Sequence, residues 1–317
     1  MSTRLLASAA TSLVQLAWIF LAGPLVLGLM RKVRSYLEGR DGASILQPLY
    51  DLRKLATRQR TRPPDATWIF SAAPVVLVAS ALVLGALAPL ASLHALLASR
   101  IDIVVVVFVL LLGSVALLLS ALDTGTAFAG MGSSRAAMIG AMTEPALLVA
   151  ILAMALGAGT SNLARLVNAG VATSTIAGPA RILALVSFFI AILAETGRLP
   201  VDNPATHLEL TMIHEAMVLE YAGPDLALIT LGESMRLVLL VGLFANLAFP
   251  WGVATHTGVL SLAIGVLALS VKVALVAIGV SVFEVTTAKL RLFRVPELLA
   301  GAFLLGVLSV ISAVALR

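Results

Sequence analysis

The sequence contains no cysteine among its 317 residues. Iron–sulfur clusters and many structural zinc sites are held by cysteine thiolates, so this chain can bind neither through thiolate, and it can form no disulfide. We therefore expect no metal on this chain and no bound cofactor, with a quinone as the possible exception. Any iron–sulfur cluster that serves it must belong to a partner subunit.

Charged residues are also scarce. They make up 12% of the chain, 60% of the residues are apolar, and the mean hydropathy is +1.07. A soluble domain has about a quarter charged residues and about half apolar ones. The composition therefore excludes a water-soluble enzyme and a disordered chain.

Long apolar runs dominate what is present. A helix that spans a bilayer needs roughly 20 mostly apolar residues. Eight stretches meet this need: Leu5–Met30, Trp68–Leu90, Ile103–Leu122, Ala136–Leu156, Ile176–Ala194, Leu226–Phe249, Gly258–Phe283 and Glu297–Leu316. They are too long and too uniformly apolar for barrel strands. We predict an all-α polytopic membrane protein with eight transmembrane helices in one integral-membrane domain, residues 1–317.

The basic residues indicate the orientation in the membrane. Nine Lys and Arg lie between residues 31 and 62, and the loops expected on that side hold 14 against 5 on the other. By the positive-inside rule, the connections at about 31–67, 123–135, 195–225 and 284–296 are cytoplasmic, and both termini lie outside the cytoplasm. This asymmetry accounts for the isoelectric point of about 10.1 without nucleic acid as a partner.

The first of these connections contains a candidate surface helix. Gln47-Pro48 precedes a mixed apolar and charged run, and proline is favoured at a helix start, so we predict a short amphipathic helix from about Pro48 to Ala56. One interpretation is an interfacial helix within a basic loop. The other is a docking surface for a cytoplasmic partner, and the two are compatible.

The connection from 195 to 225 is rich in carboxylates. We expect a cytoplasmic amphipathic helix from Thr206 to Tyr221, between the fifth and sixth spans, because Pro204 precedes it and Gly223-Pro224 follows. A solvated interfacial helix is the simpler alternative. His214-Glu215 is no zinc-protease motif, since position 218, where that motif needs a second histidine, is valine. The carboxylates of this region are Glu195, Glu209, Glu215 and Glu220.

Further charged residues are costly because they lie within the expected spans or, for Glu284, at the end of one: Glu144, Glu233, Arg236, Lys272 and Glu284. Inserting a charged residue at the bilayer centre costs about 2.5–3.5 kcal/mol of free energy on insertion scales. Each of these residues is therefore expected to have a structural or functional role. Glu233 and Arg236, three residues apart, are expected to pair, and Lys272 is expected to need a carboxylate partner. Either such pairs only hold the bundle together, or the acids form a hydrated proton path.

The run from Glu195 to Gly223 resembles the signature of the formate hydrogenlyase subunit 4 and hydrogenase-4 component C family, the group 4 hydrogenase relatives of respiratory complex I subunit 1. The resemblance covers nearly the whole chain. Its other matching pieces are Gly39-Arg40, Leu46-Gln47-Pro48, Asp51-Leu52 with Lys54-Leu55, Gly132–Arg135, Glu144–Leu148, and Glu284 with Ala288–Pro296.

The resemblance implies an eight-helix subunit of the cell (plasma or inner) membrane, complex I subunit 1-like in fold and not catalytic by itself. It would join hydrophilic hydrogenase-like large and small subunits, which hold the [NiFe] centre and the iron–sulfur clusters, to antiporter-like membrane subunits. The expected function is to anchor this oxidoreductase and to link cytoplasmic electron transfer to proton or ion translocation through buried carboxylates.

The resemblance also implies roles for individual residues. No residue is assigned to catalysis, cofactor binding or metal binding. The proton path would use Glu144, Glu195, Glu209, Glu215, Glu220, Glu233 and Lys272. The loops that face the partner would present Arg40, Gln47, Asp51, Lys54, Arg198 and Asp202.

The chain departs from complex I subunit 1 in two motifs. It has Pro200-Val-Asp-Asn-Pro-Ala-Thr-His207 where complex I has Pro-Phe-Asp-Leu-Pro-Glu-Ala-Glu, and Asp41-Gly42-Ala43 where complex I has Gly-Pro-Asn. Both differences favour the hydrogenase branch over a quinone site. A quinone-site subunit and a purely structural anchor remain the alternatives. A stand-alone transporter is disfavoured, because no inverted repeat is visible.

Overall fold

The computed structural model describes residues 2–95, 98, 102–172, 178–203, 212–256 and 258–315. Within these residues the regular structure is helical, apart from two isolated bridges, Ser92 with Ala254 and Asp102 with Asn162. The predicted all-α class is confirmed.

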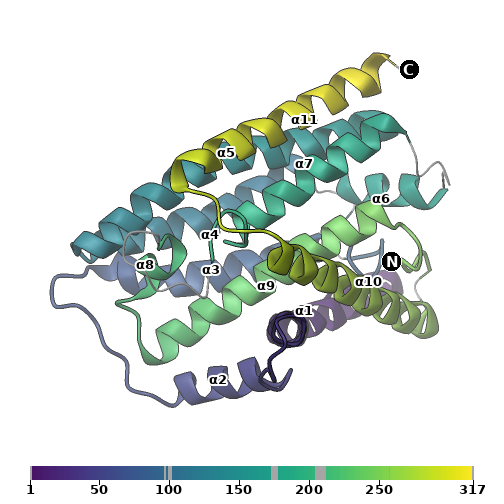
Figure 1. Cartoon of the computed structure of the whole chain (residues 1–317). Coiled ribbons are helices and arrows are strands. Elements are labelled where there is room, and N and C mark those ends of the chain that lie inside the picture. Colours follow the sequence, from purple (N-terminus) through teal and green to yellow (C-terminus); the bar gives the residue numbers. More distant parts are fainter. Residues whose placement is uncertain are drawn as a thin grey trace.

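Long helices run side by side in one bundle (Figure 1). They are α1 (Ser2–Leu37), α3 (Trp68–Leu87), α4 (Ile103–Asp123), α5 (Ala127–Ala158), α7 (Pro179–Glu195), α9 (Gly223–Ala248), α10 (Val259–Thr286) and α11 (Val295–Ala315). Shorter helices connect them: α2 (Gln47–Ala56), α6 (Leu163–Ala172), α8 (His214–Val218) and the single 3₁₀ turn η2 (Leu292–Arg294).

Seven helices of the described part of the chain are long and apolar enough to cross a membrane. The eighth expected span corresponds to α7, whose 17 residues lie at the lower limit of about 17–25 residues for a crossing helix. A multi-pass membrane protein is therefore confirmed, and the count of eight is not.

Helix α5 corrects one expected boundary. It begins at Ala127, not at Ala136, so most of the loop expected at 123–135 is helical. The reason is a cap that hydropathy does not register: the side chain of Thr126 accepts a hydrogen bond from the backbone N–H of Ala129.

Two helices were expected in the connections. The first is confirmed, because α2 covers Gln47–Ala56 with Pro48 buried and Arg53 and Lys54 exposed. The second, from Thr206 to Tyr221, is not confirmed. Its described part contains only the five-residue α8, and residues 204–211 lie outside the described chain.

Helix α9 lies at the centre of the bundle. In its most apolar 18-residue window 67% of the residues are buried, against 22% in α10 and in the last span. Helices α1, α3 and α10 pack on α9, while α11 packs on α5 and α7. Two charged residues of α9, Asp225 and Arg236, are accordingly buried, 4% and 8% exposed.

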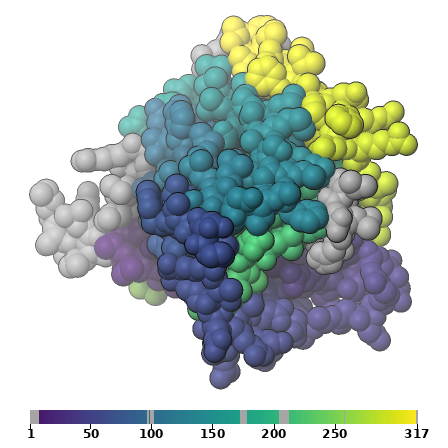
Figure 2. Space-filling model, turned by 90° about the vertical axis from the view of Figure 1, so that its left-hand side faces the viewer, coloured from purple at the N-terminus to yellow at the C-terminus, as the bar shows by residue number. Residues whose placement is uncertain are grey.

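The bundle has two ends. We call the one with α2, α8 and η2 the loop end, and the one with α6 and the two chain termini the terminal end (Figure 1). Figure 2 views the loop end, with the chain that follows α2 near its centre. That chain is fixed to α9: Gly223 has φ +60°, and a β-carbon there would lie 2.4 Å from the carbonyl oxygen of Gln59.

Candidate functional site

A cavity of about 990 Å³ enters the bundle from the loop end. Arg40, whose side chain is 73% exposed, lines it beside the surface, while Ser114 and Arg236 line it near the middle of α4 and of α9. Arg236 lies 13 residues into α9, about 20 Å along the helix axis. The cavity thus reaches from the loops to the middle of the spans.

The wall of the cavity is both charged and apolar. Seven carboxylates line it: Glu38, Glu144, Glu195, Asp202, Glu215, Glu233 and Glu284. The basic side chains on the wall are Arg31, Arg34, Arg40, Arg198, His214 and Arg236. Apolar side chains complete it, among them Leu27, Met30, Leu77, Leu111, Leu118 and Ile139. We call the charged lining residues the cavity cluster.

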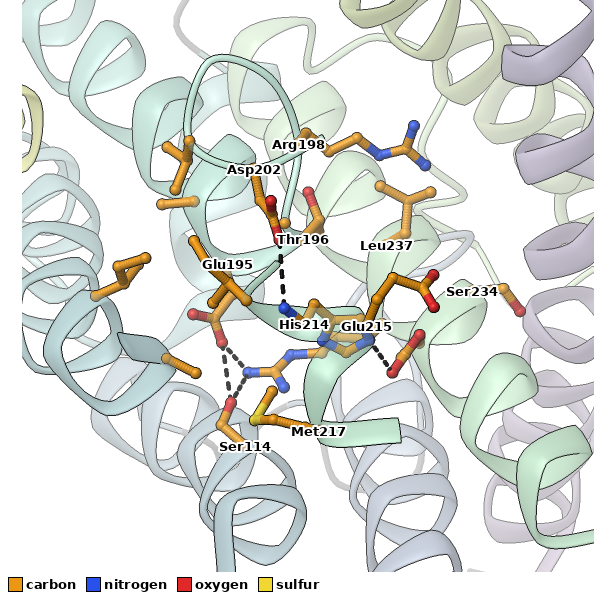
Figure 3. A pocket seen from close by; sticks show the side chains of 18 of the residues that line it. Ser114, Glu195, Thr196, Arg198, Asp202, His214, Glu215, Met217, Ser234 and Leu237 are labelled. Atoms are coloured by element: carbon orange, nitrogen blue, oxygen red, sulfur yellow. Dashed lines mark hydrogen bonds and ion pairs between the residues drawn. The ribbon is translucent and has the colours of Figure 1, made fainter. Parts of the chain in front are cut away.

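The deepest part of the cavity cluster joins three helices. Arg236 of α9 forms an ion pair with Glu195, the last residue of α7, and also donates hydrogen bonds to the Ser114 hydroxyl at 2.6 Å and the Leu110 carbonyl at 3.0 Å on α4. Figure 3 shows Ser114 and Glu195 meeting at this point. The pair satisfies both charges, as a buried charge requires.

The second part of the cluster fixes the turn that follows α7. Arg198 Nη1 lies 3.2 Å from Glu284 Oε1 of α10. Asp202 Oδ1 lies 2.7 Å from Lys289 Nζ, and Asp202 Oδ2 accepts a hydrogen bond from the backbone N–H of His214 at 3.3 Å. These contacts tie the turn after α7 to the end of α10, to Lys289 and to the start of α8.

The third part is the pair of His214 on α8 and Glu233 on α9. His214 Nε2 lies 2.6 Å from Glu233 Oε1. Burial opposes the imidazolium, but the charge of Glu233, the contact with its carboxylate, and the charges of Glu215 and Asp202 outweigh it and raise the pKa of His214 to about 9. At neutral pH the histidine is therefore a cation.

The mouth of the cavity carries its own ion pairs. Glu38 contacts Arg40, and its carboxylate also accepts a hydrogen bond from Arg34 Nε at 2.9 Å. The contacts with Arg40 and Arg34 lower the pKa of Glu38, so this carboxyl stays ionised. The mouth is thus fixed in charge, unlike the histidine pair deeper in.

Two expected pairings within the spans are wrong. Glu233 and Arg236 do not pair with each other, because Glu233 contacts His214 and Arg236 contacts Glu195. Lys272 has no carboxylate among its partners in the described chain. Its ammonium donates to Asn246 Oδ1 at 2.5 Å and to the carbonyls of Phe249 at 3.2 Å and Trp251 at 3.0 Å.

Lys272 belongs to a separate group at the terminal end, which we call the Lys272 cluster: Lys272, Asn246, Trp251 and the carbonyl of Phe249. Lys272 is 2% exposed and Asn246 is 0% exposed. The ammonium also lies 5.4 Å from the centre of the Trp251 ring. None of these residues lines the large cavity.

The expected proton-path residues are divided by the fold. Glu144, Glu195, Glu215 and Glu233 line the one cavity. Glu220 is half-buried in the turn before α9 and does not line it, and neither does Lys272. Glu209 lies outside the described residues.

The residues expected to face a partner are divided as well. Gln47 donates a hydrogen bond to Asp51 at 2.9 Å on α2, where Lys54 is exposed. Arg40 lies at the mouth of the cavity. Arg198 and Asp202 are buried in the cavity wall, 8% and 5% exposed.

Sequence reasoning did not assign roles to Ser114, Glu284 or His214. Glu284 could have been found, because a carboxylate near a membrane end beside a conspicuous Arg198 invites a pair. Ser114 carries no such signal, since hydroxyls bond to the preceding turn in many helices. Among the described residues no group of three or more His, Cys, Asp or Glu could hold a metal ion.

Comparison with known proteins shows which family this chain is similar to. The sequence model of the family described as NADH dehydrogenase matches residues 10–315. Formate hydrogenlyase subunit 4 of Escherichia coli (strain K12) is 29% identical, with 96% of this chain and 98% of that protein covered. Hydrogenase-4 component C of the same organism is 30% identical, with 94% and 93% covered.

A solved structure has the same fold. A chain of the membrane-bound sulfane sulfur reductase, an archaeal respiratory membrane complex, superposes with a TM-score of 0.82 at 20% identity, covering 96% of this chain and 98% of that one. The resemblance inferred from the sequence motifs is confirmed.

Proposed function

The chain belongs to the NADH dehydrogenase family, and from this we propose that it is the membrane anchor and coupling subunit of a hydrogenase-type oxidoreductase complex. In this proposal it holds a cytoplasmic redox module, with [NiFe] and iron–sulfur centres on partner subunits, beside antiporter-like membrane subunits. The names of its relatives, subunits of formate hydrogenlyase and hydrogenase-4, support the assignment.

We place the loop end in the cytoplasm and both chain termini outside it. Nine of the basic residues lie between 31 and 62, at this end. The helix α7 would be the eighth span, since a mostly apolar helix of 17 residues suffices where the bilayer is thin. The mouth of the cavity then opens toward the redox module.

One observation carries the coupling role: a single cavity connects the surface at Arg40 with carboxylates at the middle of the spans. Carboxylates in a wet cavity can take up and release protons when a neighbouring charge changes. The Nε atom of Arg236 is buried without a hydrogen-bond partner among the described residues. Since buried polar groups are almost always satisfied, we expect water there.

The energy needed is modest. Moving one charge across 100 mV costs about 2.3 kcal/mol. A pKa shift of about two units supplies that amount, at about 1.36 kcal/mol per unit. In the proposed mechanism electron transfer next to the turn at 196–203 changes the protonation of Glu215, Glu233, Glu195 and Glu144, and the proton passes on to the neighbouring subunits. The roles expected of Glu209, Glu220 and Lys272 stay predictions.

The test replaces the cavity carboxylates in the assembled complex. Glu144→Gln, Glu215→Gln and Glu233→Gln keep size and remove the titrating group. We expect at least a tenfold loss of proton translocation into inverted vesicles, measured by dye quenching, with subunit composition by mass spectrometry unchanged. The matched control is Glu297→Gln, an exposed carboxylate of α11.

The same experiment distinguishes a coupling subunit from a purely structural membrane anchor. Full translocation in all three variants, with intact assembly, would refute the proton path. Normal viologen-linked redox turnover without any gradient in the wild type would identify an anchor that pumps nothing.

A quinone-type ligand is the second candidate, favoured by the size of the cavity. Its volume of about 990 Å³ is at the upper end of the range of about 300–1,000 Å³ typical of small-molecule sites, and its wall is partly apolar. Photoaffinity labelling with an azidoquinone tests this. Saturable labelling of peptides lining the cavity would support it, and labelling indifferent to excess quinone would refute it.

A further inference from the structure

A second, smaller hollow adjoins the cavity beside α8. It has a volume of about 220 Å³ and is lined by Val218, Leu219, Tyr221, Leu226, Ile229 and four residues it shares with the large cavity. The shared residues are His214, Glu215, Thr230 and Glu233. We call this hollow the side pocket.

The side pocket reaches the surface and has room for water. Leu219, on its wall, is 55% exposed. A volume of about 220 Å³ accommodates several water molecules at about 30 Å³ each. Water in the side pocket can thus contact bulk solvent or the headgroup region without passing the mouth at Arg40.

The His214–Glu233 pair borders both hollows. Each side chain is 33% exposed, and Nε2 and Oε1 lie 2.6 Å apart. Figure 3 shows the imidazole of His214 pointing from α8 into the space between the helices. Nε2 and Oε1 themselves are buried, while other parts of the two side chains line both hollows. A proton donor and a proton acceptor at this separation, between two spaces that can hold water, form a minimal proton relay.

The rest of the side-pocket wall cannot carry protons. The Tyr221 hydroxyl donates to the Phe70 carbonyl at 2.8 Å, and burial raises the pKa of Tyr221 to about 12, so it keeps its proton. The Thr230 hydroxyl donates to the Leu226 carbonyl at 2.9 Å. The other residues that line this pocket, apart from His214, Glu215 and Glu233, are apolar: Val218, Leu219, Leu226 and Ile229.

Charged groups lie on the elements around the pair, and those that act on His214 itself are Glu233, Glu215 and Asp202. Asp202 follows α7 and bonds to the His214 backbone, and Glu215 is its neighbour on α8. On α5, Arg135 donates to the Met212 carbonyl at 2.9 Å, and Glu144 lines the same cavity. Asp123, at the end of α4, is held by the start of α3. The three groups whose charges act on the ring, Glu233, Glu215 and Asp202, are all acids, which favours reprotonation of the imidazole.

We infer that the His214–Glu233 pair is a proton-transfer bridge that gives the cavity a second proton entrance, from the side pocket. In one transfer the Nε2–H bond breaks, its electron pair stays on the imidazole, and the proton bonds to Glu233 Oε1. Glu233 then releases that proton to water in the cavity. The neutral ring keeps its Nδ1–H, so it turns Nε2 away from Glu233 toward the side pocket, where a water-borne proton bonds to Nε2 and restores the imidazolium. This inference rests on the proposed coupling function.

The test uses chemical rescue in the assembled complex in inverted vesicles. We expect His214→Ala to slow proton translocation at least fivefold. Added imidazole should restore most of the rate, since the side pocket and the vacated ring site admit it. Pyrazole, which has the same shape but stays neutral at pH 7, should restore nothing. A role of His214 in packing alone would respond equally to both compounds, and that result would overturn the inference.

A second variant tests the route without touching the pair. Leu219→Trp fills the mouth of the side pocket and should slow translocation at least twofold, while His256→Ala, an exposed histidine at the terminal end, should change nothing. Unchanged rates in both His214→Ala and Leu219→Trp, with loss in Glu144→Gln, would overturn the second entrance and leave the proposed function standing. Unchanged rates in all three would overturn the proposed function as well.

Discussion

The two groups of buried charge in this chain lie toward opposite ends of α9 and are built differently. The cavity cluster contains opposite charges in pairs and opens to the surface through a large space. The Lys272 cluster holds one cation with neutral oxygens, and none of its residues lines that space. Charged residues that are equally unfavourable to bury therefore do not have equal roles. A charged group beside a large open cavity can exchange protons with solvent, whereas a charged group enclosed by neutral oxygens stabilises the helix that it contacts.

The Lys272 cluster fits the second role because it closes the C-terminal end of α9. The last carbonyls of a helix have no partner within it and carry a partial negative charge. Lys272 donates to the Phe249 carbonyl just beyond α9, and Arg181 of α7 donates to the Leu247 carbonyl at 2.6 Å. At the other end of α9, Asp225 sits in the first turn and lies 2.5 Å from Arg60. Both ends of this central helix are thus compensated.

The largest expected effect is a loss of stability on removing the Lys272 ammonium, and it tests directly whether the Lys272 cluster has a structural role. Lys272→Met leaves Asn246 Oδ1 and two carbonyls without their donor, so we expect a loss of about 3 kcal/mol in the free energy of unfolding of the detergent-solubilised complex. Reversible unfolding in SDS measures it. The control Lys54→Met, on the exposed face of α2, should change the free energy by less than about 0.5 kcal/mol. A stable Lys272→Met protein with lost proton translocation would break the comparison.

The next effect tests whether the histidine pair titrates. The pKa of His214 is raised from 6.5 to about 9, so its stabilisation is fully present below pH 6.5 and is lost as the pH rises through 9. We expect about 1–2 kcal/mol, because the side chain is one-third exposed and solvent screens the pair. Unfolding of the wild type compared with His214→Gln between pH 6 and 10 measures the difference, which should shrink with rising pH. A constant difference would contradict the assignment.

The smallest effect sharpens the description of the Lys272 cluster. The Trp251 ring is exposed and lies 5.4 Å from the ammonium, so Trp251→Leu should cost about 0.5–1 kcal/mol. The same unfolding experiment measures it. Because the Trp251 carbonyl belongs to the backbone and is retained, a loss of 3 kcal/mol or more would mean that the ring, not the oxygens, holds Lys272.

Hydropathy predicted the helical bundle well, since long apolar runs leave little choice of structure. It missed α6, a ten-residue helix with too few residues to cross a membrane. It also placed the start of α5 too late, because the first turns of that helix are less apolar and depend on the Thr126 cap. The ends of helices therefore depend on local hydrogen bonds that a hydropathy window averages away.

The site was predicted in its members but not in its pairings. The family motifs and the free-energy cost of burying a charge in a membrane pointed to Glu144, Glu195, Glu215 and Glu233. The fold brings these four carboxylates to one cavity. Spacing suggested that Glu233 and Arg236 pair, since three residues along a helix bring side chains together. Partners from α7 and α8 lie nearer to each, and only the packing of separate helices could reveal them.

The chain that follows α2 is attached to the beginning of α9 at two neighbouring points. The Gln59 carbonyl oxygen lies so close to Gly223 that a β-carbon on Gly223 would be 2.4 Å from it. Arg60, the next residue along that chain, forms an ion pair with Asp225 in the first turn of α9. The stretch after α2 and the first turn of α9 therefore share one anchorage, and α9 is also the helix that carries Glu233 and Arg236.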